Sequence, residues 1–92
     1  MTLVFSFHAL SRMYERRIGR LDVRQVAEAG EAIEEYPSDR PFPSRLLLGF
    51  PRGRALHVVL AEGLKSGHNV VVTVYEPSLA EWEPGFRKRR RS

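Results

Sequence analysis

His8, Arg12 and Arg16 carry the side chains best suited to chemistry near the start of the chain, and they recur at intervals of four residues. On a helix this spacing places all three on one face, because residues i and i+4 are neighbours. An imidazole transfers protons near neutral pH. Guanidinium groups bind phosphate and stabilise the charge that develops during its transfer. The pattern indicates a metal-free site for RNA cleavage, in which the 2′-hydroxyl of the RNA is the nucleophile.

His57 and Tyr75 form a second candidate pair, because each lies in a segment whose apolar residues alternate as in a β-strand. If the more apolar register of each strand points inward, His57, Thr73 and Tyr75 share the outer face of a sheet. His57 would then be a second acid/base group, with Tyr75 as a hydrogen-bond donor. The sequence leaves open whether His8 and His57 share one site.

Each of these residues also has a purely structural interpretation. Glu15 can pair with Arg12 or Arg16 while His8 organises the start of the helix. A histidine in the middle of a strand is often hydrogen-bonded across the sheet. His68 lies in a predicted turn and is assigned no role. The three histidines are scattered and cysteine is absent, so no metal site or cofactor is expected.

Two helices are predicted before the strands. Ser6 is the expected N-cap of the first, which runs to about Ile18 and stops at Gly19. Its apolar stripe is predicted to comprise Leu10, Met13, Tyr14 and Ile18.

The second helix is predicted to begin at Asp22, which faces Gln25 in a capping-box arrangement, and Leu21 is expected to staple to Val26. Gly30 is predicted to end it.

The rest of the body reads as strands joined by turns. Residues 3–7 are predicted to be a lead-in strand or an extended arm, and Trp82 and Phe86 are expected to pack back onto the domain. The fold class is α+β: both helices pack on one face of a roughly four-stranded antiparallel sheet, and the other face stays open and able to bind a ligand. The strands are predicted at 31–36, 45–50, 55–61 and 70–75, separated by a proline-rich loop at 37–43, a turn at 51–53 and a hairpin turn at 63–69.

Charge divides the chain into residues 1–86, a single domain, and residues 87–92, a basic tail expected to be disordered. The net charge is +4, but Arg87–Arg91 supplies five positive charges, so about −1 remains for the body. The tail is of a kind that adds salt-sensitive affinity for nucleic acid. No run of 18 apolar residues and no signal-peptide pattern occurs, so a cytoplasmic protein without a membrane segment is expected.

Five segments together resemble a known family. The chain is similar to the small bacterial family catalogued as domain of unknown function four-two-five-eight, over roughly residues 5–83. Members of that family are similar in layout to metal-independent ribonuclease toxins of the RelE and MqsR type, and the resemblance implies RNA as a substrate and an antitoxin protein as a partner. By that analogy the positions to examine are His8, Arg12, Arg16, His57 and Tyr75. The segments are His8-Ala9-xx-Arg12-Met13-xx-Arg16-x-Ile18, Glu34-Glu-Tyr-Pro37, Pro43-Ser-Arg-Leu-Leu-Leu-Gly49, Leu56-His-Val-Val59 and Thr73-Val-Tyr-Glu-Pro77.

The leading hypothesis is a metal-independent endoribonuclease of toxin type, in which Arg12 and Arg16 bind the scissile phosphate and His8 or His57 moves the proton. The main alternative is a non-catalytic module that binds protein or nucleic acid through the open face of the sheet. A third hypothesis is an interaction protein that uses the acidic surface of residues 28–36 to bind a basic partner.

Overall fold

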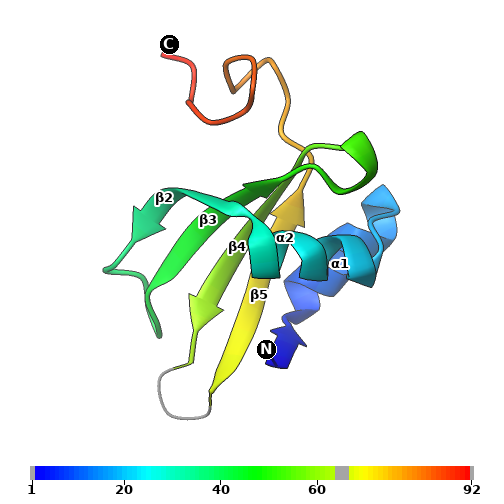
Figure 1. Ribbon diagram of the computed structural model, residues 1–92. Helices are drawn as coiled ribbons and strands as arrows, with labels where there is room; N and C mark the ends of the chain where they lie inside the picture. Colours follow the sequence, from blue (N-terminus) through cyan, green and yellow to red (C-terminus); the bar gives the residue numbers. More distant parts are fainter. Residues whose placement is uncertain (1, 64–66, 92) are drawn as a thin grey trace.

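A computed structural model describes residues 2–63 and 67–91 (Figure 1). Both helices lie on one face of a single sheet, as the sequence predicts. Within the described residues no helix is long and apolar enough to cross a bilayer. The elements in chain order are β1 (Thr2–Phe5), α1 (Phe7–Arg16), α2 (Arg20–Ala29), β2 (Glu31–Tyr36), β3 (Ser44–Gly49), a 3-10 turn (Pro51–Gly53), β4 (Leu56–Glu62) and β5 (His68–Tyr75).

The sheet has five strands in the order β1-β5-β4-β3-β2 and is mixed. The prediction of about four antiparallel strands was therefore wrong, because residues 2–5 form a strand that pairs in parallel with β5. The chain crosses two helices and three strands before β5 returns beside β1, so nothing local in the sequence reveals that pairing. The remaining three strand pairs are antiparallel.

Helix α1 begins as predicted and ends earlier. The Ser6 hydroxyl accepts a hydrogen bond from the Ala9 N–H at 2.9 Å, so Ser6 is the N-cap. Arg17 adopts a left-handed conformation and ends the helix before Ile18. Ala9 and Met13 form its buried face, whereas Tyr14 is 88% exposed. The predicted stripe is confirmed at Leu10, Met13 and Ile18, which pack on the core, and was wrong at Tyr14, which faces solvent.

Helix α2 starts three residues before the predicted position. Its N-cap is Gly19, and Asp22 lies in the first turn, where it pairs with Arg52. Leu21 is 81% exposed, so the predicted staple to Val26 does not form. Gly30 ends the helix as predicted.

The apolar core lies between the helices and the sheet, with contributions from both helices and from β3, β4 and β5. The pairing of β4 with β5 shifts between Val59 and Leu60, which lie opposite Thr73 and Val71, so Val72 of β5 is an extra, bulged residue. The bulge interrupts the simple alternation of β5, and Val71 and Val74 therefore both face the core. His57 is paired with Tyr75, and Val59 with Thr73, on the opposite face, as the alternation predicts. The loop at 37–43 separates β2 from β3, and residues 64–66 of the predicted hairpin turn lie outside the described residues.

Residues 78–91, called here the C-terminal segment, cover one end of the face that is turned away from the helices (Figure 1). Trp82 is only 2% exposed and contacts His57, which confirms that it packs back onto the domain. The predicted open face is therefore partly covered. The basic run that the sequence sets apart as a tail belongs to this segment, where Arg87 pairs with Glu31 and Arg89 with Glu34.

Candidate functional site

A groove of about 340 Å³ lies between α1, the end of β5 and the C-terminal segment. It contains three of the five site residues that the sequence predicts, namely Arg12, Arg16 and Tyr75. A second hollow, of about 300 Å³, shares these three residues and adds Ser78. The lining of the groove comprises Arg12, Arg16, Thr73, Tyr75, Glu76, Glu81, Trp82 and Arg89.

The short first strand explains how a helix on one face can reach residues on the other. β1 pairs only with residues 68–71, so the second half of β5 has no strand beyond it. The chain then turns into α1 at Ser6, whose N–H donates to the Val71 carbonyl and whose hydroxyl donates to the Val72 carbonyl. Helix α1 thus lies along the uncovered part of β5 at the sheet edge. From this edge its polar arc can meet Tyr75.

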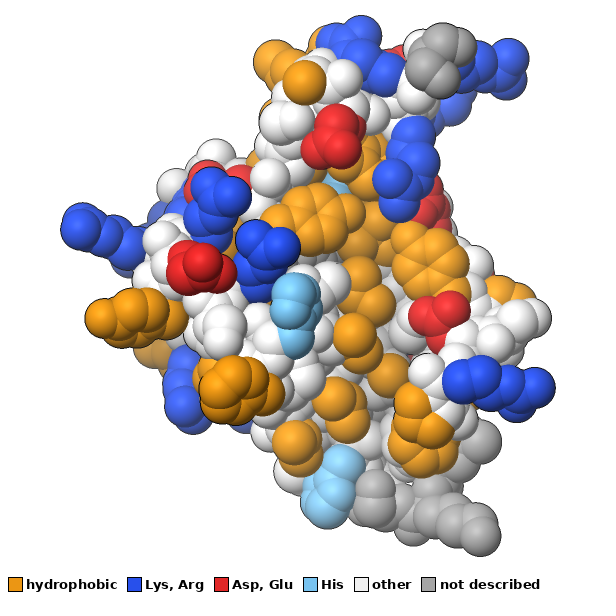
Figure 2. Space-filling model, turned by 180° about the vertical axis from the view of Figure 1, so that it is seen from behind, with side chains coloured by type: hydrophobic (Ala, Val, Ile, Leu, Met, Phe, Trp, Pro, Cys, Tyr) orange, Lys and Arg blue, Asp and Glu red, His pale blue; other side chains and the backbone are white. Residues whose placement is uncertain are grey.

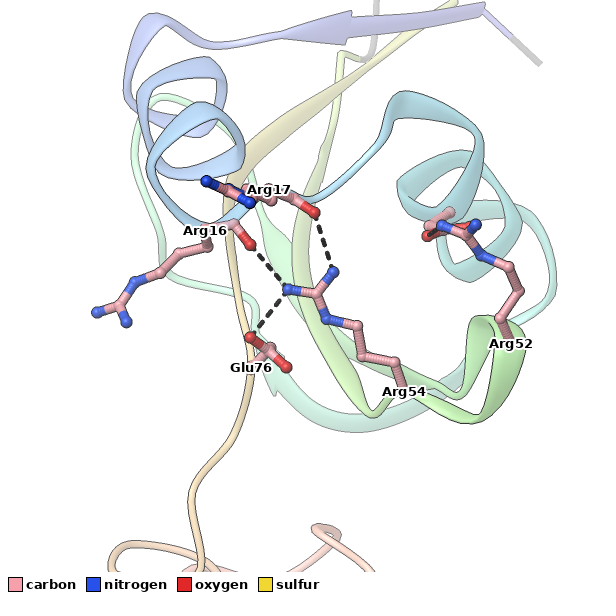
Figure 3. Close-up of polar contacts among 6 residues, drawn as sticks. Arg16, Arg17, Arg52, Arg54 and Glu76 are labelled. Carbon is pink, nitrogen blue, oxygen red and sulfur yellow. Dashed lines mark hydrogen bonds and ion pairs between the residues drawn. The ribbon is translucent and has the colours of Figure 1, made fainter.

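Arg54 joins the two walls of the groove at the end of α1 (Figure 3). Its guanidinium donates to the carbonyls of Arg16 and Arg17 at 2.8 and 3.0 Å and to the Glu76 carboxylate at 2.9 Å. A cation is favourable there, because the last carbonyls of a helix lack partners and carry partial negative charge. The Arg54 guanidinium also holds the pKa of Glu76 below its ordinary value, so Glu76 stays ionised.

His57 lies beneath the groove and is completely buried. Its Nδ1 is 3.1 Å from the Tyr75 hydroxyl, and its Nε2 is 2.9 Å from the carbonyl oxygen of Phe86. The Trp82 indole packs edge-on against the imidazole, with ring centroids 4.4 Å apart. His57 therefore has no direct access to the groove, and the Tyr75 hydroxyl is the polar group of the groove that it contacts.

The hydrogen-bond partners of His57 determine where its proton lies. A carbonyl oxygen only accepts, so Nε2 must carry the proton that is donated to Phe86. Burial lowers the pKa of His57 below its ordinary value, so the ring is neutral and Nδ1 is an acceptor. The Tyr75 hydroxyl consequently donates to Nδ1. Burial also raises the pKa of Tyr75 to about 12, so the phenol keeps its proton at neutral pH.

Arg89 closes the far wall and is largely occupied by other groups. Its Nε and Nη2 donate to the two oxygens of Glu34 at 2.9 and 3.0 Å, and its guanidinium lies 4.6 Å from the centre of the Trp82 ring. The hydrogen bonds from Arg89 lower the pKa of Glu34. Arg12 and Arg16 are exposed on the helix, and within the described residues neither forms an ion pair with an acidic side chain, although the charge of Arg16 helps to lower the pKa of Glu76. They are the cations of the groove that are best placed to bind an anion.

His8 is not brought into this groove. It lies exposed in the first turn of α1, one turn before Arg12, and is not among the residues that line either hollow. His8 and His57 therefore do not form a common pair of acid/base groups.

Sequence reasoning missed Arg54 and Arg89, which position the groove. Neither has a local signal for its carboxylate partner, because Glu76 lies 22 residues from Arg54 and Glu34 lies 55 residues from Arg89. The one usable signal was Trp82, the only tryptophan, which lies close to the basic run and predicts that this part of the chain packs on the domain.

Below the C-terminal segment the same face is mostly apolar. Figure 2 shows a column of hydrophobic side chains down this side of the molecule, flanked by charged groups. Val4, Val59 and Val70 contribute partly or fully exposed surface to it. The described residues contain no group of three or more His, Cys, Asp or Glu side chains arranged to hold a metal ion.

Comparison with known proteins gives one match. The model of the family "Domain of unknown function (DUF4258)" matches residues 5–76. No curated protein and no solved structure matches the sequence. The matched range includes Arg12, Arg16, His57 and Tyr75 and ends before Trp82 and Arg89. Because the match covers well over half of the chain, the protein belongs to this family of domains of unknown function.

Proposed function

We propose that the groove binds the phosphodiester backbone of RNA and that the protein is a metal-independent endoribonuclease. The observation that supports this best is the meeting of Arg12 and Arg16 with Tyr75, whose hydroxyl is backed by a buried neutral histidine. Cations bind and orient the phosphate, and a hydrogen-bonded pair behind the groove accepts a proton. These are the parts that cleavage by an internal 2′-hydroxyl requires.

Arg12 and Arg16 would hold the non-bridging oxygens of the scissile phosphate. They lie one turn apart on α1, so both guanidinium groups face the same side of the helix. Charge that develops on these oxygens during the reaction is stabilised by the two cations. Glu76 also lines the groove, but its pairing with Arg54 reduces its repulsion of an incoming phosphate.

Tyr75 and His57 would move the proton. The 2′-hydroxyl gives its proton to the Tyr75 oxygen while the proton of Tyr75 passes to Nδ1 of His57. The 2′-oxygen then bonds to phosphorus, and the bond from phosphorus to the 5′-oxygen breaks. The 5′-oxygen takes a proton from water, and His57 returns its proton through Tyr75 to the hydroxide so formed. The products are a 2′,3′-cyclic phosphate and a 5′-hydroxyl end.

The toxin-type assignment extends this proposal. It follows from the resemblance in layout to RelE- and MqsR-type ribonucleases, which is a fold-level analogy and a weaker warrant than the groove itself. Under it the protein acts in the cytoplasm and has an antitoxin partner.

The second candidate is a module that binds RNA in the same groove without cutting it. One observation favours it: the apolar surface beside the groove is suited to contact with a partner and has no role in cleavage. Both candidates require Arg12 and Arg16. Only the endoribonuclease requires the Tyr75 hydroxyl.

Incubating purified protein with an unstructured RNA in excess EDTA tests the proposal. The variants are Arg12→Gln, Arg16→Gln, Tyr75→Phe, His57→Gln and His8→Ala, with Arg40→Gln as a matched control because Arg40 is an exposed arginine outside the groove. We expect cleavage by the wild type, Arg40→Gln and His8→Ala, and loss of about 100-fold or more in Tyr75→Phe, the size of a proton-transfer contribution. DNA of the same sequence should stay intact, because it lacks the 2′-hydroxyl.

The same reactions with added ribosomes cover a substrate that is presented only during translation. Binding that is lost in Arg12→Gln and Arg16→Gln, without cleavage in either format, would favour the binding module. Cleavage that is lost in His8→Ala but kept in Tyr75→Phe would transfer the proton-transfer role to His8.

A further inference from the structure

The C-terminal segment makes the hydrogen bond that fixes the buried histidine. The carbonyl of Phe86 accepts from Nε2 of His57 at 2.9 Å, and Trp82 of the same segment packs on the ring. The other nitrogen faces Tyr75. Thus one partner of His57 comes from the sheet and the other from a segment that lies beyond the family-matched residues 5–76.

We infer that the C-terminal segment is a positioning element of the groove: the Phe86 carbonyl keeps the His57 proton on Nε2 and so determines the direction in which the Tyr75 hydroxyl points. The catalytic consequence rests on the proposed function, whereas the tautomer itself does not. Phe86 touches no substrate, and it acts through His57 and Tyr75.

The alternative tautomer would reverse the pair. With the proton on Nδ1, His57 would donate to the Tyr75 oxygen, and the Tyr75 hydroxyl would then turn its own proton elsewhere. Nδ1 would no longer accept a proton from Tyr75. In the arrangement that the Phe86 carbonyl favours, the Tyr75 proton points to His57, and a lone pair of the phenol oxygen stays available to a ligand hydroxyl.

Several contacts hold the Phe86 carbonyl in place. The backbone of Trp82 bridges to Arg89, and the N–H of Phe86 donates to the Glu83 carbonyl at 2.9 Å. Two ion pairs, Arg87–Glu31 and Arg89–Glu34, attach the segment to β2.

Phe86 itself has a positive φ of 62° and follows Gly85 at 91°. A non-glycine residue in this region is uncommon, although asparagine tolerates it well. The turn therefore aims the carbonyl in a direction that ordinary extended backbone would not provide.

A pair of substitutions at this one position tests the inference. Phe86→Pro is incompatible with the positive φ and removes the N–H bond to Glu83, so the carbonyl must move. Phe86→Asn is the matched control, because it also loses the aromatic ring but retains the left-handed backbone. Long-range ¹H–¹⁵N correlation of the His57 ring reads the tautomer directly. The emission of Trp82, the only tryptophan, reports whether the segment stays docked.

In the wild type and in Phe86→Asn we expect a proton on Nε2 and an unprotonated Nδ1. In Phe86→Pro we expect a mixture of tautomers and, if the protein cleaves RNA, a rate that falls in proportion to the fraction of the ring with its proton on Nδ1, at an unchanged KM. A wild-type ring with its proton on Nδ1, or an unchanged tautomer in Phe86→Pro, would overturn the inference.

The double variant Arg87→Gln/Arg89→Gln serves if Phe86→Pro fails to fold, because it weakens the attachment of the segment without a backbone change. It should show the same mixture of tautomers, and a pure Nε2 proton together with a solvent-exposed Trp82 would contradict the inference. The NMR result stands whether or not RNA is cut. The two measurements therefore distinguish a failure of the proposed function from a failure of the inference about the C-terminal segment.

Discussion

Arg54 and Glu76 are joined at 2.9 Å between Nη2 and Oε1, and the same guanidinium binds the last carbonyls of α1. The pair fastens the end of α1, which carries Arg16, to the residue that follows Tyr75 on β5. The spacing between the arginines and the tyrosine of the groove therefore depends on a side chain that lines neither hollow. The hydrogen bonds of Arg54 therefore set the position of α1 relative to β5, the two walls of the groove.

Arg54→Met should lower the free energy of unfolding by about 1–2 kcal/mol, because three hydrogen bonds from a charged donor are lost while the aliphatic stem is kept. Urea unfolding measures the change. Glu28→Gln is the control, since it removes an exposed i, i+4 ion pair with Arg24 that contributes about 0.3–0.5 kcal/mol. Equal effects of the two substitutions would show that Arg54 is no more than a surface charge.

The stability of the protein should fall as the pH drops below about 6.5 because of His57. Its pKa is lowered by burial, with the Phe86 hydrogen bond and the charge of Glu34 opposing the shift and the charge of Arg89 adding to it. The unfolded chain then binds a proton at a higher pH than the folded chain does, so acid favours unfolding in that window. Above pH 6.5 both states are neutral at this residue and the penalty vanishes.

Urea unfolding at pH 5.5 and 7.5, followed by circular dichroism, measures the slope of the free energy of unfolding against pH. His57→Gln should make this slope smaller. The slope is the test, because His57→Gln also changes stability by disturbing two buried hydrogen bonds. An identical slope in His57→Gln would assign the pH dependence to other groups.

Arg89→Gln should loosen the C-terminal segment and shift the emission of Trp82 to longer wavelength. The substitution removes both hydrogen bonds to Glu34 and the cation over the indole ring. Because Arg89 lowers the pKa of Glu34, the pair stabilises the fold fully above pH 4.5 and less as the pH falls through the lowered value. Wild-type Trp82 emission should therefore shift in that acid range, and Arg89→Gln should show the shift already at neutral pH.

Gly49→Ala should destabilise the protein by about 1–3 kcal/mol through overpacking. A Cβ at this position would lie 2.7 Å from Cγ2 of Val26, where α2 crosses β3. Gly19→Ser is the control, because nothing lies within 4 Å of a Cβ added at this position. A serine at this N-cap should raise the free energy of unfolding by a few tenths of a kcal/mol. Thermal unfolding of both variants compares them. A neutral Gly49→Ala would mean that α2 shifts away without cost.

Local sequence signals were sufficient to predict most of the helices and strands. Ser6 caps α1 because its hydroxyl needs only the N–H three residues later, and Gly30 ends α2. The alternation of side chains around His57 and Tyr75 correctly predicted that both lie on the face of the sheet opposite the core. This prediction succeeded because the two-residue period is a local property of a β-strand. The start of α2 was missed, because Asp22 is drawn into an ion pair with Arg52, 30 residues away.

Residue type and spacing alone were enough to select the groups that we propose for the groove: two arginines at i, i+4, and a histidine and a tyrosine on strands. Contacts between distant parts of the chain bring Arg12 and Arg16 to Tyr75 and leave His8 outside the groove. That outcome depends on the parallel pairing of β1 with half of β5 and on the seating of Trp82 over His57. Both are contacts between residues more than 20 positions apart. Their free energy comes from the burial of apolar surface in the assembled fold, and a local sequence pattern cannot predict which distant residues will be buried together.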